Sequence, residues 1–464
     1  MQSKISIVVL AAGLGTRMRS KKAKVLHRAG GLTLIEHVVK AAREITDPEG
    51  ITAVVGHQRD LVERTLDRTG IKFVEQAEQK GTGHALRMCQ AGLEERGGLV
   101  VVIYGDGPLL SPATIRQLIE TQESAETAAT LIAARMEDPT GYGRVLLNNE
   151  RHVTAIVEQK AAKPEELAVR LANSGIYCFR ADLLWKHIGE IQTDNPSQEY
   201  YLTDMAEILT RAGHAVGVME VADVQELLGI NTRADLATVD RIFRERKVRQ
   251  LMLDGVTIEK PETVSIDVQV RIGMDTIIEP HTRILGDTEI GEDCLVGAHS
   301  IIEDSRLADR VEVAPMTIIS GSRIDAEAHI GPFARLRMQN HVETGARIGN
   351  FVELKKTHLG AGAKANHLAY LGDSEIGAKA NIGAGTITCN FDGVNKHQTT
   401  IGPGAFVGSN STLVAPVEVG EGSYVGAGSV ITKPVPAEAL ALGRARQIVK
   451  PGWVSRRKAS ADVK

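Results

Sequence analysis

The chain has 464 residues, enough for two or three domains, and its 43% hydrophobic and 24% charged content is ordinary for a globular protein. Its formal net charge of −4 gives no global signal for a nucleic-acid partner, and we expect none. Four cysteines stand far apart without a CxxC pair, which argues against zinc binding and against a disulfide framework.

Targeting and membrane signals are also missing from the sequence. No apolar stretch approaches the ~18 residues that a membrane span needs. The N-terminal run Ile5–Leu10 is too short for a secretory signal and leads directly into glycines. We therefore expect a cytoplasmic protein without a membrane span.

The first half of the chain alternates short aliphatic runs with helical stretches. The strands are predicted at Ile5–Leu10, Ile51–Val55, Leu99–Tyr104 and Gly175–Phe179. The helices between them are predicted at Thr33–Arg43, Gln58–Leu66, His84–Leu93 and Pro112–Glu120. This order predicts an α/β domain with a mostly parallel, Rossmann-like sheet that helices cover on both faces.

The first predicted strand runs into a glycine-containing turn, Leu10–Met18. Gly13 and Gly15 leave backbone N–H groups free to point at phosphate oxygens, and Arg17 and Lys24 add positive charge. The segment has neither the Gly-Lys-Ser/Thr of a P-loop nor the third glycine of the dinucleotide-binding fingerprint. The sequence therefore predicts a phosphate-binding turn of another kind.

A single long helix is predicted over Thr232–Leu253. Thr232 and Asp235 have the spacing of a capping box, and Leu236, Val239, Ile242 and Phe243 form an apolar stripe at helical spacing. We expect this helix to be a rigid arm between two domains.

In the second half of the chain, a hydrophobic residue recurs at every sixth position. The three longest runs are Ile272, Ile278, Ile284, Ile290, Val296 and Ile302; Ile324, Ile330, Leu336, Val342, Ile348 and Leu354; and Ile401, Val407, Leu413, Val419, Val425 and Ile431. This period is typical of a parallel β-helix, in which each hexapeptide forms one side of a triangular coil and its aliphatic residue points inward.

The period fails most clearly between Thr388 and Ile401, which lie thirteen residues apart. The segment Cys389–His397 cannot lie on a regular coil and is predicted to loop out, where a rigid scaffold can present functional residues. From Arg444 to Lys464 the chain carries seven basic residues and one acidic residue, so we expect a basic C-terminal tail.

The N-terminal motifs resemble those of the sugar-1-phosphate nucleotidyltransferases. The carriers of this resemblance are the glycine turn with Lys24, the segment Gln76–Ala85 and the segment Tyr104–Asp106. The resemblance implies binding of a nucleoside triphosphate and a sugar phosphate by Leu10, Ala11, Ala12, Gly13, Lys24, Gln76, Gly81, Thr82, Tyr104, Gly105, Asp106, Gly143, Glu158, Asn173 and Asn231.

The same resemblance implies a Mg²⁺ ion held by Asp106 and Asn231, with Arg17 and Lys24 as the catalytic cations. The chain departs from the family's Pro-Lys-Val-Leu pattern, because Ala23 stands where the family usually has proline. Lys24 should keep its role, although its loop is expected to lose some rigidity.

Over Ile5 to about Trp453, the whole chain resembles the bifunctional N-acetylglucosamine-1-phosphate uridylyltransferase / glucosamine-1-phosphate N-acetyltransferase family. In the β-helix this rests on segments around Arg335, Asn350, His367 and Asn381, which coil stacking can bring together. The resemblance implies that His367 is the general base for acetyl transfer. It implies that Arg337, Lys355, Tyr370 and Asn381 bind glucosamine 1-phosphate.

The acetyl-coenzyme A positions implied by this resemblance are Ala384, Asn390, Phe391, Ser409, Ala427 and Arg444. Phe391 replaces the family's tyrosine, so a hydrogen bond from that ring is lost. Backbone N–H groups near Ala384 are expected to stabilise the oxyanion that forms during acetyl transfer.

The resemblance implies residues 1–231 as a uridylyltransferase domain, 232–254 as a helical arm and 255–464 as a left-handed β-helix acetyltransferase domain with the basic tail. The expected enzyme acetylates glucosamine 1-phosphate with acetyl-coenzyme A, couples the product to UTP with Mg²⁺, and forms a homotrimer. Two alternatives stay open: a nucleotidyltransferase with a regulatory β-helix, and a non-enzymatic scaffold.

Overall fold

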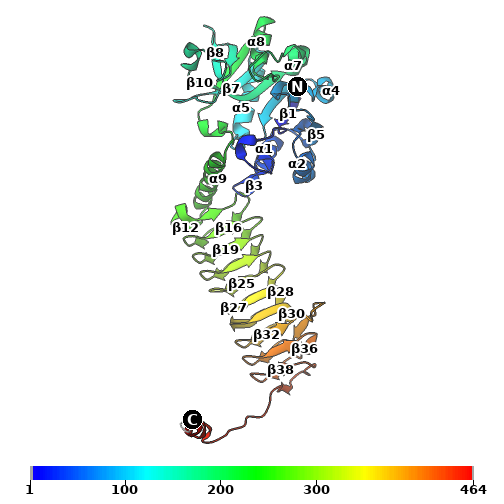
Figure 1. Cartoon of the computed structure of the whole chain (residues 1–464), viewed down its shortest axis with the longest axis vertical. Coiled ribbons are helices and arrows are strands. Elements are labelled where there is room, and N and C mark those ends of the chain that lie inside the picture. Colours follow the sequence, from blue (N-terminus) through cyan, green and yellow to red (C-terminus); the bar gives the residue numbers. More distant parts are fainter. Residues whose placement is uncertain (1–3, 462–464) are drawn as a thin grey trace. The chain divides into compact units, whose positions relative to one another are not determined.

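The computed structural model describes residues 4–461 and divides into two compact units, Met1–Phe243 and Arg244–Lys464 (Figure 1). Residues 1–3 of the predicted first domain, and residues 462–464 of the predicted basic tail, lie outside the described residues. The tail's Asp462 and Lys464 are therefore not described.

The N-terminal unit is built on one twisted sheet. Its strand order is β11-β7-β10-β6-β1-β4-β5, and β8 and β9 extend it beside β10. The bounds are β1 Ile5–Leu10, β4 Ile51–Val55, β5 Lys72–Glu75, β6 Leu99–Tyr104, β7 Ala129–Arg135, β8 Arg144–Leu147, β9 Val153–Val157, β10 Leu171–Arg180 and β11 Val216–Glu220; β2 Arg28–Ala29 and β3 Leu32–Thr33 form a separate hairpin.

Along the seven-strand path most pairs are parallel, as predicted, but β10 runs antiparallel to both β6 and β7. The pairs of β8 with β10 and β9 are also antiparallel. β1 explains why the sheet is covered on both faces. Val8 and Leu10 enter one buried cluster, whereas Ile7 and Val9 enter another. Alternation along a strand sends neighbouring side chains to opposite faces, so both faces of the sheet are buried.

The helices of this unit are α1 Leu34–Arg43, α2 Arg59–Leu66, α3 Thr82–Arg87, α4 Gln90–Leu93, α5 Pro112–Ser124, α6 Pro164–Leu167, α7 Ala181–His187 and α8 Asp204–Arg211. The prediction of a single helix over His84–Leu93 is wrong. Two helices, α3 and α4, occupy this segment, and the helical conformation is interrupted between them at Met88 and Cys89. α1 begins with a complete capping box between Thr33 and Glu36.

Helix α9, Arg233–Leu253, begins as the sequence predicted. Asp235 accepts the Thr232 N–H, and the Thr232 hydroxyl accepts the Asp235 N–H. Val239 and Ile242 belong to a buried cluster of the N-terminal unit, and Val248 and Leu251 belong to the core of the C-terminal unit. The boundary between the two units therefore falls within this helix.

The C-terminal unit is a parallel β-helix of short stacked strands (Figure 1). They are β12 Thr257–Ile258, β13 Ser265–Ile266, β14 Arg271–Ile272, β15 Ile277–Ile278, β16 Arg283–Leu285, β17 Glu289–Ile290, β18 Leu295–Val296, β19 Ile301–Glu303, β20 Arg306–Leu307, β21 Glu312–Val313, β22 Ile318–Ser320, β23 Arg323–Ile324, β24 His329–Ile330, β25 Arg335–Leu336, β26 His341–Val342, β27 Arg347–Asn350, β28 Glu353–Leu359, β29 Lys364–His367, β30 Tyr370–Ile376, β31 Asn381–Ile382, β32 Ile387–Cys389, β33 Thr399–Ile401, β34 Phe406–Val407, β35 Thr412–Val414, β36 Val417–Val419, β37 Tyr424–Val425, β38 Val430–Ile431 and β39 Leu440–Ala441. Helix α10, Trp453–Ala461, follows them.

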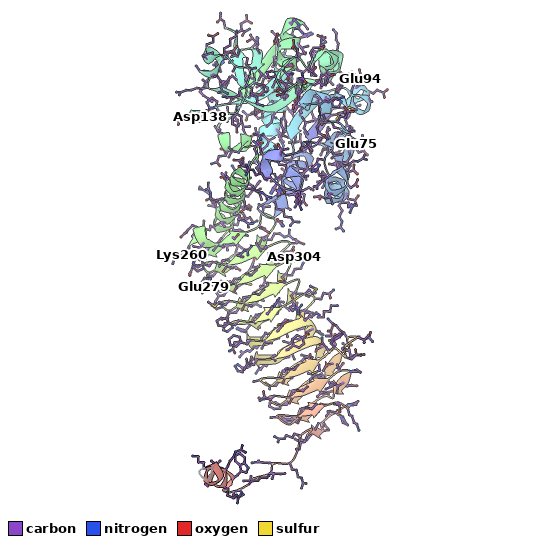
Figure 2. All side chains as sticks on the ribbon, in the orientation of Figure 1. Glu75, Glu94, Asp138, Lys260, Glu279 and Asp304 are labelled. Carbon is purple, nitrogen blue, oxygen red and sulfur yellow. The ribbon has the colours of Figure 1, made fainter. Side chains whose placement is uncertain are left out.

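The register of these strands confirms the hexapeptide prediction. Ile278 pairs with Val296, and Leu354 pairs with Leu371, so that equivalent residues recur after one full coil. Every aliphatic residue of the three predicted runs is buried in one continuous core. On the outside, Glu279 accepts the Ala298 N–H at 2.7 Å and Asp304 accepts the Asp287 N–H at 2.9 Å, so some surface carboxylates tie neighbouring coils (Figure 2).

One coil carries the predicted loop. Cys389 ends β32 and stays on the coil, and the next residues leave it as a small hairpin in which Phe391 bridges Lys396. The His397 ring and the Asn395 and Val394 N–H groups bond to Asp392 and lower the pKa of its carboxyl to about 2. The chain then rejoins the stack, since Ile376 pairs with Ile401.

Candidate functional site

A cavity of about 490 Å³ opens at the carboxyl end of β1, where the glycine turn begins. Its lining includes the predicted residues Leu10, Ala11, Ala12, Gly13, Arg17, Lys24, Gln76, Gly81, Thr82, Tyr104, Asp106 and Asn231. Gly15 has a φ of +62°, and a Cβ there would lie 2.7 Å from the Lys24 Cβ. A glycine is therefore needed both for the backbone and for the approach of Lys24.

Four charged and polar side chains converge in this cavity. Lys24 forms an ion pair with Asp106, and its Nζ lies 3.4 Å from Asn231 Oδ1. Arg17 donates to the same Asn231 oxygen at 2.8 Å. The Lys24 and Asp106 side chains are only 16% and 18% exposed, so water screens their charges weakly. Two cationic side chains thus meet two side chains that offer oxygen atoms, a carboxylate and an amide.

Backbone contacts hold Asp106 and Asn231 in place. Asp106 follows β6, and its carbonyl accepts the Ile230 N–H at 3.1 Å. Asn231 precedes α9, and its N–H donates to the Asp235 carboxylate at 3.0 Å. Gly105 donates its N–H to the Leu10 carbonyl at 3.0 Å. Segments more than a hundred residues apart therefore fix one group of side chains.

The segment Gln76–Ala85, which carried part of the resemblance, lies on another wall of the same cavity. Gln76 is buried, and its Nε2 donates to the Gly81 carbonyl at 3.0 Å. Gly81 has a φ of +106°, and a Cβ there would lie 2.5 Å from the Tyr200 carbonyl oxygen. The Thr82 hydroxyl accepts the Leu202 N–H at 3.1 Å. The loop is thus held against the segment before α8.

Three more of the predicted substrate-binding residues, Gly143, Glu158 and Asn173, form a group of their own. Asn173 donates its N–H to the Gly143 carbonyl at 2.8 Å and its Nδ2 to the Tyr177 hydroxyl at 3.1 Å. A Cβ on Gly143 would lie 3.5 Å from a Glu158 carboxylate oxygen. Burial raises the pKa of Glu158, which indicates a poorly hydrated carboxylate.

A second cavity, of about 400 Å³, adjoins the first and shares Arg17, Tyr104, Asp106 and Asn231 with it. Its other lining residues include Tyr142, Ser174 and Glu226. These residues, and Glu199 in the first cavity, are not among the positions that the sequence predicted. Tyr142 and Glu199 lie in loops, Ser174 lies within β10, and Glu226 lies in a short 3-10 helix. None belongs to a recognisable motif, so the sequence held no signal that could have found them.

In the β-helix, His367 lies at the end of β29 and is exposed. Its Nδ1 lies 2.9 Å from Asn350 Oδ1, one coil away. The register of β29 and β31 places Ala384 one coil further on. Asn410 N–H donates to the Ala384 carbonyl at 2.7 Å, and Gly428 N–H donates to the Ser409 carbonyl at 2.8 Å.

The predicted positions His367, Ala384, Ser409 and Ala427 therefore follow one corner of successive coils. A Cβ on Gly408 would lie 2.5 Å from the Ala427 nitrogen, which fits this stacking. We refer to this row as the corner column.

A group of cations lies on an adjoining face. The pKa of the Lys355 ammonium is lowered. The main cause is Lys396, which lies within hydrogen-bonding reach, and loss of hydration and the charge of Arg337 add to the effect. Lys396 comes from the looped-out hairpin, and the sequence analysis did not assign it a role. Its position depends on how the hairpin folds back, so spacing along the chain gave no signal for it.

Tyr370 and Asn390 meet beside the cation group. A Cβ on Gly372 would lie 2.5 Å from the Tyr370 hydroxyl and 2.7 Å from Asn390 Nδ2. Asn390 is buried and donates its Nδ2 to the Asp373 carboxylate at 2.5 Å. Gly372 therefore leaves room for both polar side chains.

Other predicted positions lie elsewhere. Asn381 belongs to the other sheet, in register with Lys364 and Phe406. Phe391 is 58% exposed on the hairpin, and Arg444 is exposed after β39. Phe391 pairs with Lys396 across the hairpin, whereas neither Asn381 nor Arg444 has a side-chain hydrogen bond to the cation group among residues 4–461.

Comparison with protein families assigns a class to each unit. Residues 7–168 match the model of a MobA-like NTP transferase domain. Residues 269–304 and 398–433 match the bacterial transferase hexapeptide (six repeats). The chain is thus a bifunctional transferase that joins a nucleotidyltransferase to a hexapeptide-repeat acyltransferase.

Full-length relatives define the family more closely. The chain is 58% identical over 463 residues to the "Bifunctional protein GlmU" of Solibacter usitatus (strain Ellin6076), with 100% of this chain and 99% of that protein covered. The proteins of the same name from Koribacter versatilis (strain Ellin345) and Alkaliphilus metalliredigens (strain QYMF) are 48% and 44% identical, with 99% and 98% of this chain and 99% of each protein covered. The chain belongs to the GlmU family.

Membership of this family confirms the bifunctional enzyme that the sequence predicted. The chain is a nucleotidyltransferase and an N-acetyltransferase of UDP-N-acetylglucosamine synthesis, with a sugar phosphate, UTP and acetyl-coenzyme A as substrates. The regulatory and scaffold alternatives are set aside. Along residues 4–461, no helix is both long and apolar enough to cross a bilayer.

Proposed function

We propose that residues 1–231 carry uridylyl transfer, that residues 232–254 are an arm, and that residues 255–464 carry acetyl transfer. The division into two compact units supports this assignment. In the reaction that we assign to the N-terminal domain, a phosphate oxygen of N-acetylglucosamine 1-phosphate attacks the α-phosphorus of UTP, and pyrophosphate leaves.

This reaction needs positioning and neutralised charge rather than a protein nucleophile. The observation that carries the proposal is the meeting of Arg17, Lys24, Asp106 and Asn231 in one cavity. Arg17 and Lys24 hold phosphate oxygens and offset the negative charge that builds up on them. Leu10, Ala11, Ala12, Gly13, Gln76, Gly81 and Thr82 bind the nucleotide, and Tyr104, Gly105, Gly143, Glu158 and Asn173 bind towards the sugar.

Asp106 and Asn231 supply carboxylate and amide oxygens, the donor type that Mg²⁺ prefers, so this pair fits the predicted ion. Lys24 contacts both residues, which supports their closeness. When bound, Mg²⁺ supplies positive charge to phosphate oxygens.

For acetyl transfer, His367 is the general base. Asn350 Oδ1 accepts from Nδ1, which places the proton there and leaves Nε2 to take a proton from the amine of glucosamine 1-phosphate. Nε2 takes this proton as the amine nitrogen attacks the thioester carbonyl of acetyl-coenzyme A. The C–S bond then breaks, the proton passes to the sulfur, and coenzyme A leaves as the thiol. Arg337 and Lys355, assisted by Lys396, bind the sugar phosphate, while Tyr370 and Asn381 bind the sugar.

Acetyl-coenzyme A lies along the corner column, with Ala384, Ser409 and Ala427 beside it and with Asn390, Phe391 and Arg444 as further contacts. We infer a homotrimer, as the resemblance to β-helix acyltransferases implies. Asn381 and Lys355 lie on different sheets of one chain, which fits a site that a neighbouring copy completes. We also infer a cytoplasmic location, which the free cysteines of the described residues support.

Paired variants of the full chain test this division. Asp106→Asn should lower uridylyl transfer by about 10²–10³-fold and leave acetyl transfer unchanged, whereas His367→Ala should lower only acetyl transfer, by about 10²–10⁴-fold. Asp138→Asn, a surface carboxylate, and His329→Gln, a surface imidazole, are matched controls for each half. Both activities are measured by product formation; acetyl transfer intact in His367→Ala would show that its role is wrong.

A further inference from the structure

A row of histidines and carboxylates lies on the outside of the β-helix, on a sheet face that the proposed acetyl site does not use. His341 in β26 is in register with His358 in β28, and His358 is in register with Glu375 in β30. The two imidazole rings stack with centroids 5.1 Å apart and an interplanar angle of 13°. Val342 and Leu359 follow these histidines and are buried, so the imidazoles point outward.

Possible metal-binding atoms of three side chains converge here. One such atom each from His341, Glu343 and His358 lie within 4.8 Å of one another. His358 Nε2 is 2.9 Å from a Glu343 oxygen, and His341 Nε2 is 2.7 Å from an Asp325 oxygen. A cation with bonds of about 2.1 Å keeps its ligand atoms roughly 3.4 Å apart. This spacing lies between the hydrogen-bond distances of 2.7 and 2.9 Å and the upper limit of 4.8 Å.

Further contacts orient the same side chains. His358 Nδ1 lies 2.7 Å from a Glu375 oxygen, which leaves Nε2 directed at the cluster. The second oxygen of Glu343 accepts the Ala361 N–H at 2.8 Å, and Asp325 accepts from Arg323 at 3.0 Å. A carboxylate behind a metal-binding histidine is the usual partner in metal sites.

We propose that His341, Glu343 and His358 form a binding site for a divalent transition metal of the zinc class. Asp325 contacts His341, and Glu375 contacts His358, so each imidazole has a carboxylate partner outside this group of three ligands. Two imidazoles with one carboxylate suit Zn²⁺ or Co²⁺ better than Mg²⁺, which prefers oxygen donors alone, and a water molecule can fill the fourth position. The sequence pointed away from zinc because that argument counted cysteines, whereas these ligands meet only through the stacking of successive coils.

Other histidines of the β-helix set this cluster apart. His329 bonds to Glu312 at 2.8 Å, and His281 stacks on His299 with ring centroids 4.8 Å apart. Only the cluster around His358 combines stacked imidazoles with carboxylates into a group of three metal-binding residues among those described. His329→Gln is therefore a matched control, since it removes a histidine that also pairs with a carboxylate.

The test is a titration of metal-free, full-length protein with Zn²⁺ in excess Mg²⁺, which occupies oxygen-only sites. Isothermal titration calorimetry should show that the wild type binds one Zn²⁺ per chain. This binding should be lost in His341→Gln/His358→Gln, at least tenfold weaker in Glu343→Gln, and unchanged in His329→Gln. Co²⁺ should give the visible absorption of a tetrahedral site in the wild type and not in the double variant. Circular dichroism shows whether each variant is folded.

A second measurement does not depend on affinity. A metal that joins neighbouring coils should raise the thermal unfolding midpoint of the wild type and not that of the folded double variant. Equal Zn²⁺ binding by the wild type and the double variant, or no binding by the wild type, would overturn the proposal. The row would then be only a ladder of ion pairs.

Discussion

Ala23 stands beside the proposed catalytic lysine, where the resemblance leads one to expect proline. Its N–H donates to Gln58 Oε1 at 2.7 Å, and Gln58 Nε2 donates to the Lys21 carbonyl at 2.7 Å. One side chain therefore restrains the backbone on both sides of Lys22. These two hydrogen bonds supply a restraint that proline would supply through its ring, so the expected loss of rigidity is offset.

This restraint predicts a coupling between positions 58 and 23. Gln58→Ala should lower the kcat of uridylyl transfer about fivefold to tenfold, because Lys24 loses part of its positioning. Ala23 has a φ of −54°, which proline can adopt, so Ala23→Pro should restore most of the rate in the Gln58→Ala background. Kinetics of the four proteins test the coupling.

The acetyl transfer of the same four proteins serves as an internal control and should stay constant. If the effects of the two substitutions on kcat simply multiply, Gln58 does not act through the Lys24 loop.

At the scale of elements, helix α8 of the N-terminal unit begins with Asp204, a carboxylate whose charged form is destabilised by its surroundings. Burial, together with the charges of Glu207 and Glu158, raises the pKa of Asp204 to about 6. Its usual value is about 3.9, so the folded state binds more protons than the unfolded state between these values. The stability of this unit should therefore fall as pH rises from about 4 to 6, and the full penalty should persist above pH 6.

Asp204→Asn should remove that penalty. The variant should be more stable than the wild type by about 1 kcal/mol at pH 8, after allowance for a half-buried group, and nearly equal to it at pH 4. Urea unfolding followed by the fluorescence of buried Trp185 measures this unit. Asp182→Asn is the control, since a hydrogen bond from Arg180 lowers the pKa of Asp182 and its loss should not stabilise the protein at pH 8.

The elements also show how far the sequence could predict this structure. β1, β4 and β6 have their predicted bounds because each is a mostly aliphatic and mostly buried run with a glycine at or shortly after its end. The hexapeptide runs were equally clear, since each inward position repeats on every coil side. The break between α3 and α4 was missed because local helical spacing continues through it.

For the candidate sites, motifs pointed to residues that directly follow strands, such as Asp106 after β6. They did not point to Glu199 or Lys396, which reach the sites only because distant loops pack there. Nor did they show the cluster of His341 and His358, because these two residues are seventeen positions apart and meet only when the chain completes one coil.

At the scale of the whole molecule, each compact unit has its own buried core. A fragment of residues 1–253, which retains all of α9, should therefore fold and keep uridylyl transfer within about fivefold of the full chain, without acetyl transfer. Both activities of the purified fragment can be measured directly. A folded fragment that has lost uridylyl transfer would mean that the second unit completes the first site.

The hairpin that leaves the β-helix after Cys389 interrupts one coil without altering its neighbours, since Ile376 meets Ile401 as if no residues had been inserted. A β-helix of this kind can gain an inserted hairpin at a turn between two strands while the coils before and after it keep their register. New binding chemistry can thus arise in such proteins by lengthening a single bend, with the aliphatic interior left untouched.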